Sequence, residues 1–177
     1  HLPDDMVCVP GQHDLPNHRI DEMHRCGYGV LVRAGKIKDC SDMPFMPQAS
    51  HRLIVTGCGW GQEIPQASSG TGFSGLRVLL IHRYCWLGEF YPGASTDEHV
   101  AAFSKSLKGY DVAVFGDNHK GFIKELKSGT VVTNCGGFIR RKSDEQLYCP
   151  ALSVIYNDGT VSRQRLQTED DLFHEDA

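Results

Sequence analysis

The fold is decided by a short stretch near the start of the chain, VCVPGQHDLPNH, which spans residues 7–18. An apolar strand runs into Gly11 there, and an amide, an imidazole and a carboxylate follow it as Gln12, His13 and Asp14. Loops that follow strand ends in α/β folds are exposed on a rigid scaffold, so they are where such folds place reactive groups. Gln12 offers a carbonyl oxygen, His13 a proton near neutral pH, and Asp14 a group able to orient that imidazole.

Two later apolar runs end in residues of the same kind. Residues 76–81 are followed by His82, and residues 111–115 are followed closely by Asp117 and His119. The carboxyl ends of parallel strands lie along one edge of a sheet, so we expect all these groups to meet there. Imidazole, carboxylate and amide oxygen form a mixed shell that suits Mn²⁺, Fe²⁺, Mg²⁺ or Zn²⁺. A pair of such ions activates water and stabilises a phosphoryl transition state, and this is the chemistry that the pattern predicts.

The rest of the chain predicts an α/β fold, a layered sandwich of mixed sheets flanked by helices. We expect one domain over residues 1–166 and an acidic tail over residues 167–177. The remaining expected elements are strands at 6–10 and 52–56, helices at 19–26 and 95–107, a loop at 39–49, and hairpins at 122–133 and 151–165. The chain has no starting Met and enters a strand almost at once, so we expect that it is N-terminally truncated.

Composition narrows the class of protein. With 177 residues, 40% of them hydrophobic, the chain is large enough for a globular core. The formal net charge of −4 means that nucleic-acid binding must rest on a local patch. The seven cysteines form no C-x-x-C motif, so we expect free thiols in a reducing compartment and a cytoplasmic protein. Apolar runs long enough to span a membrane are absent from the sequence, so we expect no membrane association.

The polar strand ends resemble a known family. Residues 11–14 (GQHD), His82 and residues 116–119 (GDNH) resemble the last three motifs of the calcineurin-like metallophosphoesterases, which are G-N-H-[DE], a lone His and G-H-x-H. Residues 134–145 (NCGGFIRRKSDE) look like the segment that follows them in the SbcD-type DNA repair nucleases and their phage relatives. The resemblance covers roughly residues 6–145 and rests on the order of the motifs.

The resemblance implies a role for each matching residue. Four residues stand at the positions that bind two divalent metal ions: Gln12, His82, Asp117 and His119. His13 stands at the histidine that assists departure of the leaving group, with Asp14 as its orienting carboxylate. His13 would give a proton or a hydrogen bond to the developing alkoxide.

The sequence departs from the family pattern in three places. The motifs D-x-H and G-D-x-x-D, which supply further ligands, do not occur upstream, since only eleven residues precede Gln12. Gln12 itself replaces Asn, which keeps the amide oxygen but adds a methylene. Asp117 replaces His, which adds negative charge and favours Mn²⁺ or Mg²⁺ over Zn²⁺. We therefore expect Mn²⁺ as the preferred metal and no turnover by this chain alone.

Three functions remain open at this point. The leading one is a two-metal phosphodiesterase that acts as a DNA nuclease. The second is a metallophosphoesterase that acts on a small phosphodiester or a phosphoprotein, and the third is a catalytically degenerate scaffold that serves as a binding subunit. The resemblance also implies DNA as the substrate, a coiled-coil ATPase as partner and assembly as a homodimer.

Further residues are candidate substrate contacts: Asn17, His18, Arg140 and Arg141. For Asn17 we favour a helix N-cap before residue 19 over a place in the site. For the two arginines, contact with DNA phosphates and a place in a charged turn are equally good interpretations. Two interpretations remain open for Trp60 and for the loop that carries Tyr84 and Trp86: they form a wall of the substrate site, or they take part in ordinary packing.

Overall fold

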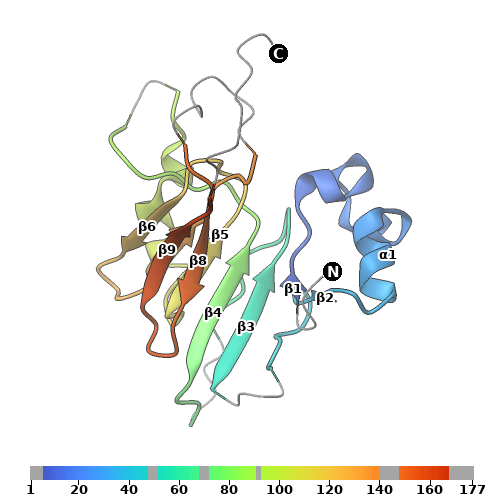
Figure 1. Cartoon of the computed structure of the whole chain (residues 1–177), viewed down its shortest axis with the longest axis horizontal. Helices are drawn as coiled ribbons and strands as arrows, with labels where there is room; N and C mark the ends of the chain where they lie inside the picture. The colour runs from blue at the N-terminus through green and yellow to red at the C-terminus, as the bar shows by residue number, and fades with distance from the viewer. Residues whose placement is uncertain (1–5, 48–51, 68–71, 91–92, 140–147, 168–177) are drawn as a thin grey trace.

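The computed structural model describes residues 6–47, 52–67, 72–90, 93–139 and 148–167, and it has the α/β fold that the sequence predicts (Figure 1). Its centre is a five-stranded mixed sheet in the order β3-β4-β5-β7-β6. The strands are β3 (Leu53–Cys58), β4 (Leu76–Ile81), β5 (Val112–Phe115), β6 (Phe122–Glu125) and β7 (Val131–Asn134). All neighbouring pairs run parallel except β6 and β7, which form an antiparallel hairpin as predicted.

The register of the sheet aligns the carboxyl ends of its parallel strands. Ile81 at the end of β4 pairs with Cys58 of β3 and with Phe115 of β5, and Phe115 pairs with Asn134 of β7. The chain therefore leaves four neighbouring strands at the same edge, so the loops that follow them start side by side. This alignment brings the polar residues after β4 and β5 together.

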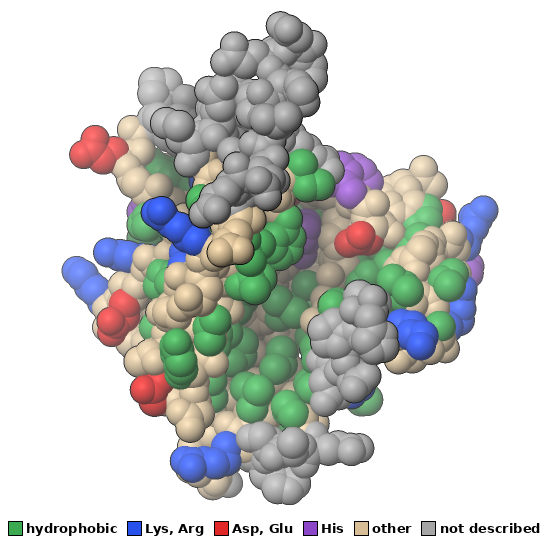
Figure 2. Space-filling model, in the orientation of Figure 1, with side chains coloured by type: hydrophobic (Ala, Val, Ile, Leu, Met, Phe, Trp, Pro, Cys, Tyr) green, Lys and Arg blue, Asp and Glu red, His purple; other side chains and the backbone are tan. Residues whose placement is uncertain are grey.

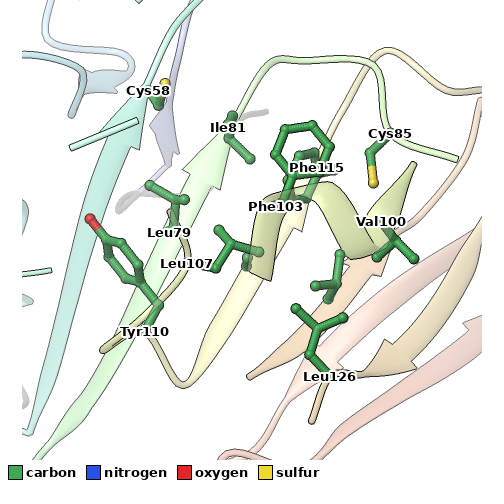
Figure 3. Close-up of a cluster of buried hydrophobic side chains, with 12 residues drawn as sticks. Cys58, Leu79, Ile81, Cys85, Val100, Phe103, Leu107, Tyr110, Phe115 and Leu126 are labelled. Carbon is green, nitrogen blue, oxygen red and sulfur yellow. The ribbon is translucent and has the colours of Figure 1, made fainter. Parts of the chain in front are cut away.

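The hydrophobic core lies on one face of this sheet (Figure 3). Leu79 and Ile81 of β4 point into it beside Phe115 of β5, and Phe103 and Leu107 cover them from the segment above. The rings of Phe103 and Phe115 are 4.9 Å apart between centroids. Burying each such side chain contributes about 1.5–3 kcal/mol, so this layer holds the segment against the sheet.

The other face of the sheet is less completely covered. A two-stranded antiparallel sheet, β8 (Ala151–Ile155) and β9 (Val161–Arg165), lies against part of it, and this is the second predicted hairpin. A contact of 2.7 Å between the hydroxyls of Thr133 and Ser153 joins it to β7. An open apolar groove of about 600 Å³ remains between β3, β4 and the tip of the hairpin, and Figure 2 shows this hollow among hydrophobic side chains.

The segment predicted as one helix over residues 95–107 is instead two 3₁₀ turns, η4 (Thr96–Glu98) and η5 (Val100–Ser104). Trp86 causes the break, because its backbone N–H donates to Glu98 and its carbonyl accepts from Val100. These bonds hold His99 in an extended conformation, which a continuous helix excludes. Val100, Phe103 and Leu107 of this segment nevertheless reach the core.

The helix predicted over residues 19–26 is also different in the structure. A 3₁₀ helix, η3 (Ile20–Arg25), is followed by α1 (Gly27–Arg33), which runs through the glycines expected to end a helix. A Cβ at Gly29 would lie 2.1 Å from the carbonyl oxygen of Met23. Gly29 is therefore required for the close packing of α1 on η3, which sequence periodicity does not reveal.

The opening stretch forms the short strand β1 (Val7–Cys8), which pairs in parallel with β2 (Lys38–Asp39) at the start of the predicted loop. After it come two 3₁₀ turns, η1 (Gln12–Asp14) and η2 (Pro16–His18). Backbone bonds from Gly57 to Cys40 and from Trp60 to Pro10 attach this unit to the end of β3. The opening stretch is thereby placed at the carboxyl edge of the main sheet.

None of the helices in the described part of the chain is long and apolar enough to cross a bilayer. All seven cysteines are free thiols, as expected. The residues of the predicted acidic tail from 168 onward lie outside the described residues, so the predicted domain boundary stays a prediction.

Candidate functional site

A cleft of about 340 Å³ opens at the carboxyl edge of the sheet. Its walls come from the opening stretch, from the end of β4, from the loop after β5 and from the loop after β7. The lining residues are 11, 13, 14, 82, 115–119 and 134–137. The three polar strand ends therefore do converge, as the sequence predicted.

His82 is held between two glycines. A Cβ at Gly11 would lie 2.7 Å from His82 Cε1, and a Cβ at Gly116 would lie 3.1 Å from His82 Nδ1. Gly11 has an ordinary extended backbone with φ −92°, so its role is to leave space rather than to make an unusual turn. The glycines that open both outer motifs thus make room for the imidazole of the middle one.

Gln12 links the opening stretch to the loop after β5. Its Nε2 donates to Asp117 Oδ1 at 3.4 Å and lies 3.5 Å from His13 Nε2. Its Oε1 is buried and has no hydrogen-bond partner among the described residues. A buried acceptor without a partner is unfavourable by about 1–3 kcal/mol, so this oxygen has the character of a ligand atom.

Asp14 has a different partner from the one predicted. Its Oδ2 accepts a 2.8 Å hydrogen bond from the backbone N–H of Gly11, which closes the η1 turn. Among the described residues no hydrogen bond joins Asp14 to His13, because the Asp14 carboxylate turns back to the Gly11 N–H. Asp14 thus positions His13 through the backbone, and His13 itself is exposed at the cleft.

The loop after β5 carries a strained backbone. Asp117 has φ +71°, in the left-handed region that side chains other than glycine rarely adopt. Asn118 holds the loop, because its Nδ2 donates to the Cys85 carbonyl at 2.7 Å and its Oδ1 accepts from the Lys120 N–H at 2.9 Å. Strain of about 1–3 kcal/mol maintained by such contacts is typical of functional sites.

Two supporting residues were missed by the sequence reasoning. Asn134, only 2% exposed, accepts from the Gly136 N–H at 2.6 Å and donates to the Gly116 carbonyl at 3.5 Å, so it ties two cleft loops together. Arg163 of β9 donates to the Cys135 carbonyl at 3.2 Å. A buried polar residue at a strand end was the available signal for Asn134, whereas nothing local in the sequence marks Arg163.

The candidate substrate residues have mixed outcomes. Asn17 is not a helix N-cap, because it lies inside η2 with φ +52° and its Nδ2 contacts Glu22 Oε2 at 3.5 Å. The ring of His18 lies 5.7 Å from that of His13 between centroids. Trp86, 5% exposed, packs on its own loop. Arg140 and Arg141 lie outside the described residues, so their role stays a prediction.

Two cysteines belong to the segments that form the cleft, Cys8 in β1 and Cys135 after β7. Burial, followed by the Asp39 and Asp14 carboxylates, raises the pKa of the Cys8 thiol, so it stays protonated at neutral pH. Cys135 lines the cleft, and its Sγ contacts Ser153 Oγ at 3.3 Å.

The fit to a metal ion is partial. The free Oε1 of Gln12 and the gathering of His82, Asp117 and His119 around one cleft favour a cation. Among the described residues, however, no group of three His, Cys, Asp or Glu side chains is close enough together to hold one metal ion. The residues present supply part of a ligand shell, and at least one further ligand is needed to complete it.

Comparisons with known proteins bear on the fold only. No known protein family matches the chain, and no curated protein sequence does. Its structure is similar to the crystal structure of TT1561 of Thermus thermophilus, with a TM-score of 0.50 and 14% sequence identity. The similarity covers 90% of this chain and 71% of that one. At this identity a shared α/β fold is all that the similarity shows.

Proposed function

We propose that this chain forms part of a metal-dependent phosphodiesterase that acts on DNA. The observation that carries the proposal is the cleft itself, where histidines and carboxylates from three segments line one space of about 340 Å³. The buried Oε1 of Gln12, which has no partner among the described residues, is its most specific feature. The order of the motifs along the chain supports the same class of enzyme.

Gln12, His82, Asp117 and His119 would hold the divalent ions, with Mn²⁺ preferred. When bound, such ions activate water and neutralise the charge of the phosphate. His13 is exposed at the cleft and protonates the leaving oxygen. Asp14 positions it by closing the η1 turn through the Gly11 N–H. Asn118 and Asn134 hold the loops after β5 and β7 that line the cleft.

Manganese binding by the chain tests the ligand assignment. We expect a weak Mn²⁺ site, because the described residues complete no shell, and at least tenfold weaker binding in His82→Ala. Electron paramagnetic resonance of free Mn²⁺ measures this directly. His24→Ala is the control, since His24 is exposed and its ring contacts the Asp21 carbonyl at 3.1 Å, away from the cleft residues. Equal binding by both variants, or no binding at all, would favour the degenerate scaffold.

The substrate class is tested with linear duplex DNA and a small chromogenic phosphodiester, each with Mn²⁺. We expect no turnover of either by the chain alone, but Mn²⁺-dependent binding of the duplex. If DNA is cleaved and His13→Ala lowers the rate about 10²-fold or more, the nuclease assignment holds and the expectation of an incomplete site is wrong. Turnover of the small ester alone would exclude the nuclease and favour the second function.

The wider assembly is proposed by resemblance alone. A coiled-coil ATPase partner and a homodimer belong to this proposal, and sedimentation of the chain with and without DNA tests the second of them.

A further inference from the structure

A row of three rings, His13, His18 and Trp60, starts at the cleft. The ring centroid of His18 lies 5.7 Å from that of His13, with an interplanar angle of 87°. On its other side it lies 6.5 Å from the ring of Trp60, at 83°. His13 lines the cleft, so the row begins where the leaving group would depart and extends away from it.

The backbone fixes the positions of these rings. His18 and the residue before it, Asn17, have φ +57° and +52°, and two consecutive left-handed residues turn the chain back toward His13. Trp60 is fixed by its backbone N–H, which donates to the Pro10 carbonyl at 2.9 Å. A Cβ at Gly59 would lie 2.9 Å from Pro10 Cδ, so glycine is needed for this approach.

The two outer rings lie outside the buried core. His18 is exposed and Trp60 is only half-buried, and neither side chain has a hydrogen-bond partner among the described residues. Trp86 shows the contrast: it is 5% exposed, and its Nε1–H donates to the Ser95 carbonyl at 3.0 Å. Trp86 serves the core, whereas His18 and Trp60 present aromatic surface to solvent next to a candidate active site.

We propose that His18 and Trp60 form a platform for a nucleobase on the leaving-group side of the scissile phosphate, where the base stacks on the face of one ring and meets the edge of the other, since the two rings stand at 83°. The inference rests on the proposed function, and it specifies the substrate as a strand with at least one unpaired base beside the cleft. Aromatic side chains bind bases of any identity through their faces, so the platform selects nucleic acid over a phosphoprotein or a simple phosphate ester. It also predicts little dependence on base sequence.

The test compares two single strands of equal length and equal charge, an oligothymidylate and a fully abasic oligomer. Binding of each to the intact chain is measured by fluorescence anisotropy with Mg²⁺ present. We expect the oligothymidylate to bind about fivefold or more tightly than the abasic strand. His18→Ala and Trp60→Ala should remove this preference while leaving the affinity for the abasic strand unchanged, and His24→Ala should change neither.

The outcomes separate the platform from the site it serves. Equal affinity of the wild-type chain for both strands overturns the platform but leaves the phosphodiesterase proposal standing. Loss of affinity for both strands in Trp60→Ala, with an unchanged circular dichroism spectrum, also overturns it, because the residue then contacts backbone or supports the loop. No binding of either strand overturns the platform together with the proposed DNA substrate.

Discussion

At the scale of single residues, the site depends on where side chains are absent as much as on where they are present. Gly11 and Gly116 leave the space that the His82 ring occupies. Asp117, in contrast, keeps a side chain at φ +71°, where glycine is favoured. Both observations indicate that the cleft geometry is maintained at a local cost in conformational free energy, as is common in functional sites.

Gly11→Ala should move the His82 ring. The added methyl would lie 2.7 Å from Cε1, so we expect the free energy of unfolding to fall by about 1–3 kcal/mol and Mn²⁺ binding to weaken as in His82→Ala. Urea denaturation measures the first effect. Gly27→Ala is the matched control, because nothing lies within 4 Å of its Cβ position, and its stability should be unchanged or higher. Wild-type Mn²⁺ affinity in Gly11→Ala would contradict the role of Gly11 in leaving space for the His82 ring.

Asp117→Gly should change the stability of the protein and its metal binding in opposite directions. Glycine relieves the left-handed backbone, so we expect the protein to be about 1 kcal/mol more stable while Mn²⁺ binding weakens. Asn17→Gly relieves a similar conformation, φ +52°, at a residue that is not a proposed ligand. It should give the stability gain alone. If both variants bind Mn²⁺ equally well, Asp117 is not a ligand.

At the scale of elements, contacts between segments override local preference. Residues 95–107 have a helical pattern, yet the backbone of Trp86 bonds on both sides of His99 and divides them into two turns. Likewise β9, remote in sequence from the cleft, supports it through Arg163, whose guanidinium donates to the Gly121 and Cys135 carbonyls at 3.3 and 3.2 Å. The second hairpin is thus part of the support of the site.

Arg163→Met tests that support. Two carbonyls lose a donor, so we expect the free energy of unfolding to fall by about 1–3 kcal/mol and Mn²⁺ binding to weaken as the loop after β7 loosens. Arg165→Met on the same strand is the control, since Arg165 is exposed, and its stability should change by less than about 0.5 kcal/mol. An equal loss of stability in both variants would show that β9 needs its charges for another reason.

At the scale of the whole molecule, burial controls the ionisation of the cysteine thiols. Burial raises the pKa of Cys85 to about 12, and burial together with Asp39 raises the pKa of Cys40 to about 12, from an ordinary 9.0. Above about pH 9 the thiols of the unfolded chain therefore ionise while those of the folded chain do not. Their contribution to stability is fully present below that pH and falls as the pH rises toward 12.

Denaturation with urea across this alkaline range measures the effect. We expect the free energy of unfolding to be flat from about pH 7 to 9 and then to fall by about 1.4 kcal/mol per pH unit for each of the two thiols. The double variant Cys40→Ala, Cys85→Ala should start less stable but fall less steeply. An identical slope would mean that other groups, such as the tyrosines, dominate the alkaline transition.

The sequence by itself determined the class of fold and the location of the site. Buried strands such as 76–81 and the turn at Asp158 and Gly159 are local signals, because burial and turn geometry act on neighbouring residues. The convergence of His82, Asp117 and His119 followed from strand polarity alone, because β4 and β5 are parallel neighbours. These features need no knowledge of which distant segments touch.

Only the tertiary structure decided the roles that depend on distant contacts. It showed Gly11 as space for His82, Asp14 as a turn-closing carboxylate, and Asn134 and Arg163 as supports of the cleft. It also broke one predicted helix at His99 and extended another element through Gly29. Most of these depend on atoms far apart in the chain, whose approach is set by packing of the whole sheet and not by local periodicity.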